Sequence, residues 1–152
     1  MKHLLTTALL ALTPLAAAAE DTALDRWRED PMQVFEASEI SLEDLVWEVR
    51  PVVVFAQSPN DPLFSQQMDL LRAEMDELAL RDVMVIVDTD PEARTSARLK
   101  LRPRAFMLAL IGKDGQIKLR KPAPWDVREL SRSIDKMPLR QQEMRDRRGT
   151  DG

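Results

Sequence analysis

The chain has 152 residues, a net charge of −4 at pH 7, one histidine and no cysteine. The absence of cysteine excludes disulfides and the thiolate chemistry of redox proteins, and the acidic balance argues against nucleic acid as a ligand, because neutralising phosphates requires a basic face. A chain of this length fits one domain, which buries about two thirds of the surface that the unfolded chain exposes and needs no disulfides.

Residues 1–19 have the three parts of a secretory signal peptide. A charged start at Lys2 and His3 precedes an apolar stretch over residues 4–12, and the small residues Ala16–Ala19 end the segment. The apolar stretch is too short to stay in a bilayer as a helix, so cleavage after this segment is expected. Cleavage removes the only histidine. We therefore expect a periplasmic or secreted mature chain without a membrane span.

The mature chain is predicted to begin with a strand and a short helix. Residues 32–37 alternate apolar and polar side chains, as in an edge strand. Ser41 is a suitable N-cap for a helix to about Glu48, with acidic residues in its first turn. After a break at Pro51, the continuous apolar run Val52–Phe55 is typical of a strand covered on both faces.

Two further helices alternate with buried strands. Asp61 is a suitable cap for a long helix, in which apolar residues recur at steps of four and three over residues 64–78. A second apolar run, residues 83–87, precedes a helix that reaches from about residue 90 to residue 101. Both crossovers are long enough for parallel βαβ units. Asp88 ends the second buried strand, where ligands gather in open sheets.

The last third is predicted to form a hairpin and a helix. A third buried strand over residues 106–111 leads into Asp114-Gly115, a strong hairpin signal, and residues 117–120 return with one buried and one solvated face.

A final helix is expected from Asp126, which can form a capping box with Glu129, to Pro138, which stops it. The low apolar content at the end of the chain predicts a flexible tail over residues 146–152. The chain is therefore expected to be one domain, residues 20–145, between a signal peptide and a tail.

The predicted order of elements, β-α-β-α-β-α-β-β-α, resembles the thioredoxin fold, an α/β sandwich with a central mixed sheet. Three segments resemble the domain-of-unknown-function family 4174 of the thioredoxin-like and peroxiredoxin-like superfamily, namely residues 50–62, 110–120 and 134–145. The third contains Met-Pro-x-Arg-x-x-Glu-Met-Arg and is the most specific. The resemblance implies a fold and an exported or secreted protein of bacteria or animals, but no reaction.

The resemblance to thioredoxin stops at the redox site. Redox thioredoxins carry Cys-x-x-Cys at the start of the helix after this strand, where the helix dipole lowers a thiol pKa. The corresponding residues here are 60–63, Asn-Asp-Pro-Leu. Pro103, ahead of the third buried strand, is the candidate for the cis-proline beside that redox site. We therefore expect a redox-inactive domain without thiol oxidoreductase activity.

The loop after the first buried strand is the best ligand candidate, through Ser58, Asn60 and Asp61. Amides at the start of the following helix point outward and can hold an anion. The alternative is that Asp61 only caps the helix and fills that position with its own negative charge. Arg120, on the solvated face of the hairpin, is a second ligand candidate, with a surface ion pair as the alternative. No cofactor or metal site is predicted.

The segment beyond Pro138 is the candidate partner-binding surface, through Arg140, Glu143 and Arg145. Arg140 and Glu143 are three residues apart, so one helical turn brings them onto one face. That turn either folds back on the sheet or presents its charges to a protein partner.

Three functions remain open at this point. The first is a redox-inactive binding or protein-interaction module of unknown ligand. The second is an enzyme of peroxiredoxin-like ancestry that works without cysteine, such as a carboxylate-based hydrolase. The third is a partner-dependent chaperone that docks through its basic tail.

Overall fold

A computed structural model describes residues 21–150 of the chain. The predicted signal peptide, residues 1–19, lies outside the described residues, as do the last two residues of the predicted tail. Within residues 21–150, no helix is long and apolar enough to cross a membrane.

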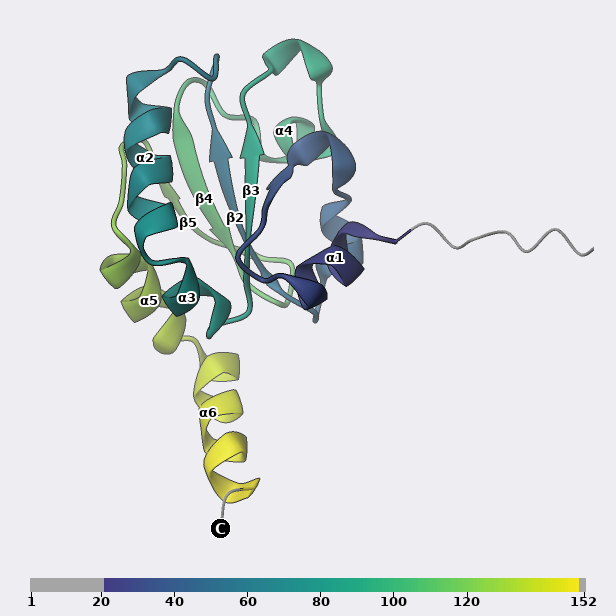
Figure 1. The fold of residues 1–152 in the computed structure, drawn as a ribbon, viewed down its shortest axis with the longest axis vertical. Helices are drawn as coiled ribbons and strands as arrows, with labels where there is room; N and C mark the ends of the chain where they lie inside the picture. Colours follow the sequence, from purple (N-terminus) through teal and green to yellow (C-terminus); the bar gives the residue numbers. More distant parts are fainter. Residues whose placement is uncertain (1–20, 151–152) are drawn as a thin grey trace, which may run out of the picture.

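The centre of the fold is a five-stranded mixed sheet, as predicted (Figure 1). Strand β2 lies in the middle of the order β1-β3-β2-β4-β5. It is parallel to β3, which is parallel to β1, and it is antiparallel to β4, which pairs antiparallel with β5. The strands are β1 (Val34–Glu36), β2 (Arg50–Phe55), β3 (Val83–Asp88), β4 (Met107–Ile111) and β5 (Ile117–Lys121).

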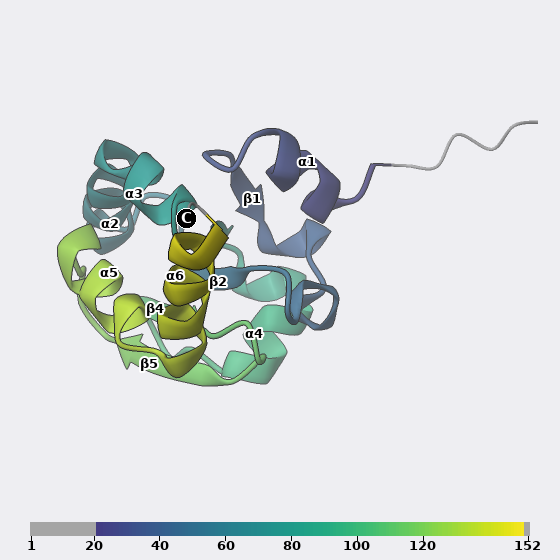
Figure 2. The ribbon, with the colours of Figure 1, turned by 90° about the horizontal axis from the view of Figure 1, so that it is seen from below.

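Helices cover both faces of this sheet. The helices of the described residues are α1 (Ala23–Glu29), α2 (Pro62–Ala73), α3 (Met75–Ala79), α4 (Ser96–Leu101), α5 (Val127–Asp135) and α6 (Pro138–Thr150), with short 3-10 turns η1 (Ala37–Glu39), η2 (Leu42–Leu45) and η3 (Pro91–Ala93). Figures 1 and 2 show α2, α3 and α5 over one face and α1 and α4 over the other.

The core has one layer on each side of the sheet, because successive strand residues point to opposite faces. In β2, Val53 and Phe55 face α1 and α4, whereas Val52 and Val54 face α2, α3 and α5. All six positions of β2 and all six of β3 are buried. This two-sided burial is the reason that both strands have continuous apolar runs instead of alternation.

The structure differs from the predicted elements in several places. The second crossover does not produce a parallel unit, because β4 pairs antiparallel with β2. The helix expected over residues 41–48 is only the 3-10 turn η2, followed by Trp47 with a positive φ of 69°. Helix α1 was not expected, although Thr22 and Asp25 form a capping box at its start.

Helix α6 projects from the end of the sheet at which β2 begins (Figures 1 and 2). The preceding helix α5 ends at Asp135, and Pro138 is the first residue of α6. Proline suits the first helical position, since its missing N–H has no partner there. The segment from Met137 to Arg145 is therefore ordered, as predicted, and residues 146–150, expected as part of a flexible tail, continue the helix.

Candidate functional site

The loop that takes the place of the redox motif satisfies its own polar groups. Asp61 accepts a hydrogen bond from the Leu63 amide at 2.8 Å and so caps α2. The Ser58 hydroxyl accepts from the Asn60 amide at 3.1 Å. The carboxylate of Asp61 thus occupies the place that an external anion would take at this helix, which is the alternative that the sequence left open. A ligand at this loop stays a prediction.

Residues 21–150 contain no cis peptide bond, so Pro103 does not reproduce the cis-proline of thioredoxins. In the same range, no three histidine, cysteine, aspartate or glutamate side chains lie together as ligands of a metal ion.

Behind this loop, a buried ion pair holds the carboxyl ends of β2 and β3 together. The guanidinium of Arg98, from α4, contacts Asp88 Oδ1 through Nε at 2.9 Å and through Nη2 at 2.7 Å. The same Nη2 donates to the carbonyl oxygen of Ala56 at 2.9 Å, and Thr95 donates its hydroxyl to the second carboxylate oxygen. Both carboxylate oxygens of Asp88 are therefore engaged within the domain.

Four cationic side chains surround a hollow of about 340 Å³ at the same end of the sheet, where β2 and β3 finish. We name it the basic groove, and its cations are Arg102, Arg104, Arg120 and Lys121. No acidic residue lines it. The floor includes the buried Phe106. The side-chain amide of Gln57 donates to the carbonyl oxygen of Arg104 at 3.4 Å, which places the groove next to the loop that replaces the redox motif.

The cations of the basic groove lack acidic partners. Among residues 21–150, none of the four forms an ion pair, whereas the buried arginines Arg50, Arg98 and Arg140 do. The three groove arginines are exposed, and Lys121 is half-buried. Arg120 donates to the carbonyl oxygen of Leu101 at 2.6 Å, and the Lys121 ammonium lies 4.3 Å from the centre of the Trp125 ring. The surface ion pair considered for Arg120 is thus not present. Charges on an edge strand such as β5 also hinder edge-to-edge pairing, which is the alternative explanation for Arg120.

Sequence reasoning found Arg120 and missed the other three groove cations. Arg102 and Arg104 follow a short helix and are separated from Arg120 by strand β4, so no local pattern joins them. The sequence does place two basic residues before the predicted hairpin and two at its end, and the two ends of a hairpin lie side by side.

A second buried arginine, Arg50, lies at the opposite end of the sheet, at the start of β2. Its guanidinium donates to the Arg81 carbonyl oxygen at 2.9 Å and to Glu143 Oε1, from α6, at 3.0 Å. Lys113 Nζ lies 2.8 Å from Asp82 Oδ2 and 3.0 Å from Glu143 Oε1. We name these five residues the Arg50 cluster.

The three predicted partner-binding residues have different surroundings in the structure. Glu143 belongs to the Arg50 cluster, and Arg140 is buried beside Asp135 and Glu143, at 3.4 Å from each. The charges of these two residues therefore fold back onto the domain, which is one of the two arrangements expected. Arg145 is exposed. The two acids that Arg140 contacts lie within five residues of it in sequence.

The two acidic residues that hold α6 have shifted pKa values. Burial raises the pKa of Glu143, but the hydrogen bonds and charges of Arg50 and Lys113 outweigh burial, so that pKa lies below its ordinary value. Burial likewise acts on Asp135, and Arg81 and Arg140 again bring its pKa below the ordinary value. Both carboxylates stay charged in the folded chain.

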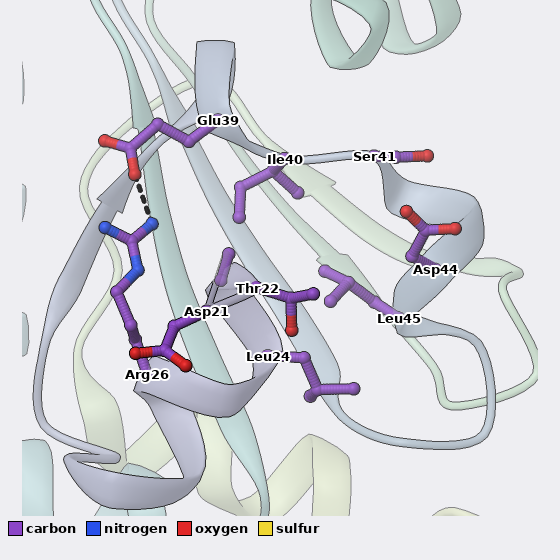
Figure 3. Close-up of a pocket in the computed structure, with 10 residues that line it drawn as sticks. Asp21, Thr22, Leu24, Arg26, Glu39, Ile40, Ser41, Asp44 and Leu45 are labelled. Carbon is purple, nitrogen blue, oxygen red and sulfur yellow. Dashed lines mark hydrogen bonds and ion pairs between the residues drawn. The ribbon is translucent and has the colours of Figure 1, made fainter. Parts of the chain in front are cut away.

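A further hollow of about 450 Å³ lies between α1 and the turns η1 and η2 (Figure 3). Arg26, the cation in its wall, is paired with Glu39, and the Thr22 hydroxyl is engaged by Asp25. Its rim begins at Asp21, next to the residues that the structure does not describe. The Nε of Arg26 is buried without a hydrogen-bond partner, although the rest of its guanidinium is paired with Glu39.

Comparison with known proteins agrees with the fold. A family model described as "Domain of unknown function (DUF4174)" matches residues 41–143. Among solved structures, the chain is similar to a reduced 2-Cys peroxiredoxin of Plasmodium vivax, with a TM-score of 0.53, 11% identity, and coverage of 68% of this chain and 85% of that one. It is also similar to thioredoxin peroxidase I of Plasmodium yoelii, with a TM-score of 0.52, 14% identity, and coverage of 68% and 81%. At these identities the likeness supports the fold alone, and it confirms the thioredoxin-like prediction.

Proposed function

Because the chain belongs to the family described as domain of unknown function 4174, and has a peroxiredoxin-like fold without cysteine, we propose that it is an exported, redox-inactive binding domain. Peroxide reduction by thiols requires a thiolate that becomes a sulfenic acid, and no residue of this chain can form one. The peroxide reduction for which the similar proteins are named therefore does not transfer to this chain, and what transfers is the scaffold.

The observation that supports a binding role is the basic groove. Four positive charges gather around one hollow in a protein whose net charge is −4. Like charges in a shared concave site repel one another, and an anion that enters the site relieves this repulsion. Three of the four cations are arginines, whose planar guanidinium groups bind carboxylates and phosphates with two hydrogen bonds. The ligand that fits is an anion with two or more negative charges.

An experiment on the chain without its predicted signal peptide tests this role. Inorganic pyrophosphate is titrated into the isotopically labelled protein at constant ionic strength, and amide shifts are followed by NMR. We expect saturable shifts at residues of the basic groove and at Gln57. The double variant Arg102→Ala and Arg104→Ala should weaken pyrophosphate binding at least tenfold.

The matched control removes two exposed cations on or beside α5, by Arg128→Ala and Lys136→Ala. This variant has the same net charge as the groove variant and should bind pyrophosphate like the unmodified chain. Equal weakening in both variants means that binding follows net charge, and the groove is then not a site.

Export is tested separately. The chain recovered from its native host should have its N-terminus at or near Glu20 by mass spectrometry. Recovery of a chain that still begins at Met1 in the cytoplasm contradicts export but leaves the groove untouched.

A further inference from the structure

A third hollow, of about 260 Å³, lies at the opposite end of the sheet from the basic groove. It is bounded by Trp47, by residues at the start of α6, and by the hairpin between β4 and β5. We name it the Trp47 hollow. Each of the three segments that resemble the family contributes to its wall, through Arg50, Lys113 and Met137 respectively.

Trp47 is unusual in both its exposure and its backbone. Its side chain is 66% exposed, the highest value among the large apolar residues of the described chain. Its φ of 69° lies in the left-handed region, which bulky residues avoid. The Trp47 amide donates to the Lys113 carbonyl oxygen at 2.6 Å, which holds this conformation in place. Core packing does not explain the exposure, since Trp47 belongs to neither layer of the core.

The wall of the Trp47 hollow combines an apolar side with a cationic side. Met137 and Leu139 contribute apolar surface together with the Trp47 indole, and Arg50, Lys113 and Lys118 contribute positive charge. Asp114 is the acid in this wall, and it is paired with Lys118 at 2.7 Å. The cations in the wall therefore outnumber the acids.

These cations have hydrogen-bond donors to spare. Arg50 Nε is buried without a partner, although the rest of its guanidinium is engaged. An ammonium group has three donors. Lys113 Nζ contacts two carboxylates and Lys118 Nζ contacts one, so both retain donors for a further acceptor. Because Glu143, Asp82 and Asp114 already match the three cations in charge, the spare donors fit one carboxylate and not an anion with several charges.

From this combination we propose that the Trp47 hollow binds a small molecule with an aromatic or aliphatic body and a single carboxylate. The carboxylate meets Lys118 and Lys113, and the apolar body lies between the Trp47 indole, Met137 and Leu139. A water molecule occupies roughly 30 Å³ in the liquid, so the hollow has room for a ligand that replaces about eight waters. Phenylacetate is of that size and chemistry. This proposal is independent of the anion proposed for the basic groove.

To test this proposal, phenylacetate is titrated into the chain without its predicted signal peptide, and amide shifts are followed by NMR. Two probes serve as chemical controls, namely 2-phenylethylamine, which has the same ring and the opposite charge, and acetate, which has the charge without the ring. We expect saturable shifts at Trp47, Lys113 and Leu139 with phenylacetate, and at least tenfold weaker binding of either control probe. Equal binding of phenylacetate and 2-phenylethylamine overturns the proposal.

Two variants locate the site, and both leave the fold intact because they change exposed or half-buried groups. Trp47→Ala and Lys118→Gln should each weaken phenylacetate binding at least fivefold without lowering the melting temperature. Their controls are Leu80→Ala, which removes another exposed apolar residue, and Lys100→Gln, which removes a lysine paired with Glu43. Loss of binding in the controls as well, or unchanged binding in both site variants, refutes the site.

The same variants separate this proposal from the basic groove. Pyrophosphate binding should be unchanged in Trp47→Ala and Lys118→Gln, and phenylacetate binding should be unchanged when Arg102 and Arg104 are replaced. Failure of one ligand to bind therefore leaves the other proposal standing.

Discussion

Strand β2 has a buried arginine at each end, and the two are stabilised in different ways. Arg98 packs against the end of the strand, where its guanidinium carbon lies 5.5 Å from the centre of the Phe55 ring. Its acid, Asp88, is only ten residues away in sequence. Arg50 begins the strand, and its acid, Glu143, is 93 residues away on a helix that projects from the domain.

The difference predicts how each end unfolds. The Arg98–Asp88 pair joins α4 to the two central strands, so its loss exposes the core itself. The Arg50 cluster joins the sheet to α6, in which Arg140 is the buried residue. Because few apolar contacts support α6, its attachment depends on charge. We infer that the first pair sets the stability of the whole domain and that the cluster sets the local stability of α6.

The largest effect is expected from Arg98→Met. Methionine fills much of the space of the arginine stem but leaves the Asp88 carboxylate buried with Thr95 as its remaining side-chain partner. Removing one partner of a buried ion pair costs about 3–5 kcal/mol of unfolding free energy. Urea denaturation at pH 7 measures this loss. The double variant Arg98→Met and Asp88→Asn removes the stranded charge and should regain part of it, and a double variant as unstable as the single one contradicts this explanation.

A smaller effect is expected from Glu143→Gln. The amide keeps the shape of the carboxylate but removes the charge that Arg50 and Lys113 share. A hydrogen bond between charged groups contributes about 1.5–3 kcal/mol, and the partial exposure of Glu143 puts the expected loss near the lower end of that range. Hydrogen exchange should accelerate in α6 but not in β2 or β3.

The neighbouring Gln142→Ala, on the exposed side of α6, is the control and should leave exchange unchanged. If Glu143→Gln accelerates exchange in the central strands as much as in α6, the two ends of β2 form one cooperative unit and the contrast between them disappears.

Acid should release α6 before it unfolds the domain. The pKa values of Glu143 and Asp135 are lower in the folded chain than their ordinary values of 4.5 and 3.8. Such groups stabilise the fold fully above their unfolded pKa, and this stabilisation is lost as pH falls through the folded pKa. Exchange in α6 should therefore rise once the pH drops below about 4.5, relative to exchange in the central strands. In Glu143→Gln this dependence should be weaker, and a dependence of unchanged size refutes the role of Glu143.

The parts of the fold that the sequence predicts correctly are those with local signals. Strands β2 and β3 follow from continuous apolar runs, and α2 from the cap at Asp61. The hairpin follows from Asp114-Gly115, where Gly115 has a φ of 75° that other residues rarely adopt. In each case the physical cause lies within a few residues of the signal.

The parts that the sequence does not predict depend on contacts between distant residues. Crossover length does not reveal that β4 returns along β2 in the antiparallel direction. The burial of Arg50 and Arg98 is equally hidden, because arginine is usually exposed and its burial depends on acids and carbonyl groups brought from elsewhere. The basic groove also joins residues that are distant along the chain, so Arg120 was found as a candidate without the three cations that complete the groove.

The smallest effect is expected from removing the end of α6. Truncation after Arg145 removes residues 146–150, which are exposed, together with the last two residues of the chain. Among them is Arg147, whose side chain is 57% exposed and whose guanidinium lies 3.9 Å from Asp82. An exposed pair of this kind contributes well under about 1 kcal/mol, so urea denaturation should show a loss of no more than about 0.5 kcal/mol. Truncation after Lys136 also removes Arg140 and Glu143, and should cost at least as much as Glu143→Gln because Arg50 then loses its acidic partner on α6. If the two truncations have equal effects, the Arg50 cluster does not attach α6, and the charges at this end of β2 then have only a surface role.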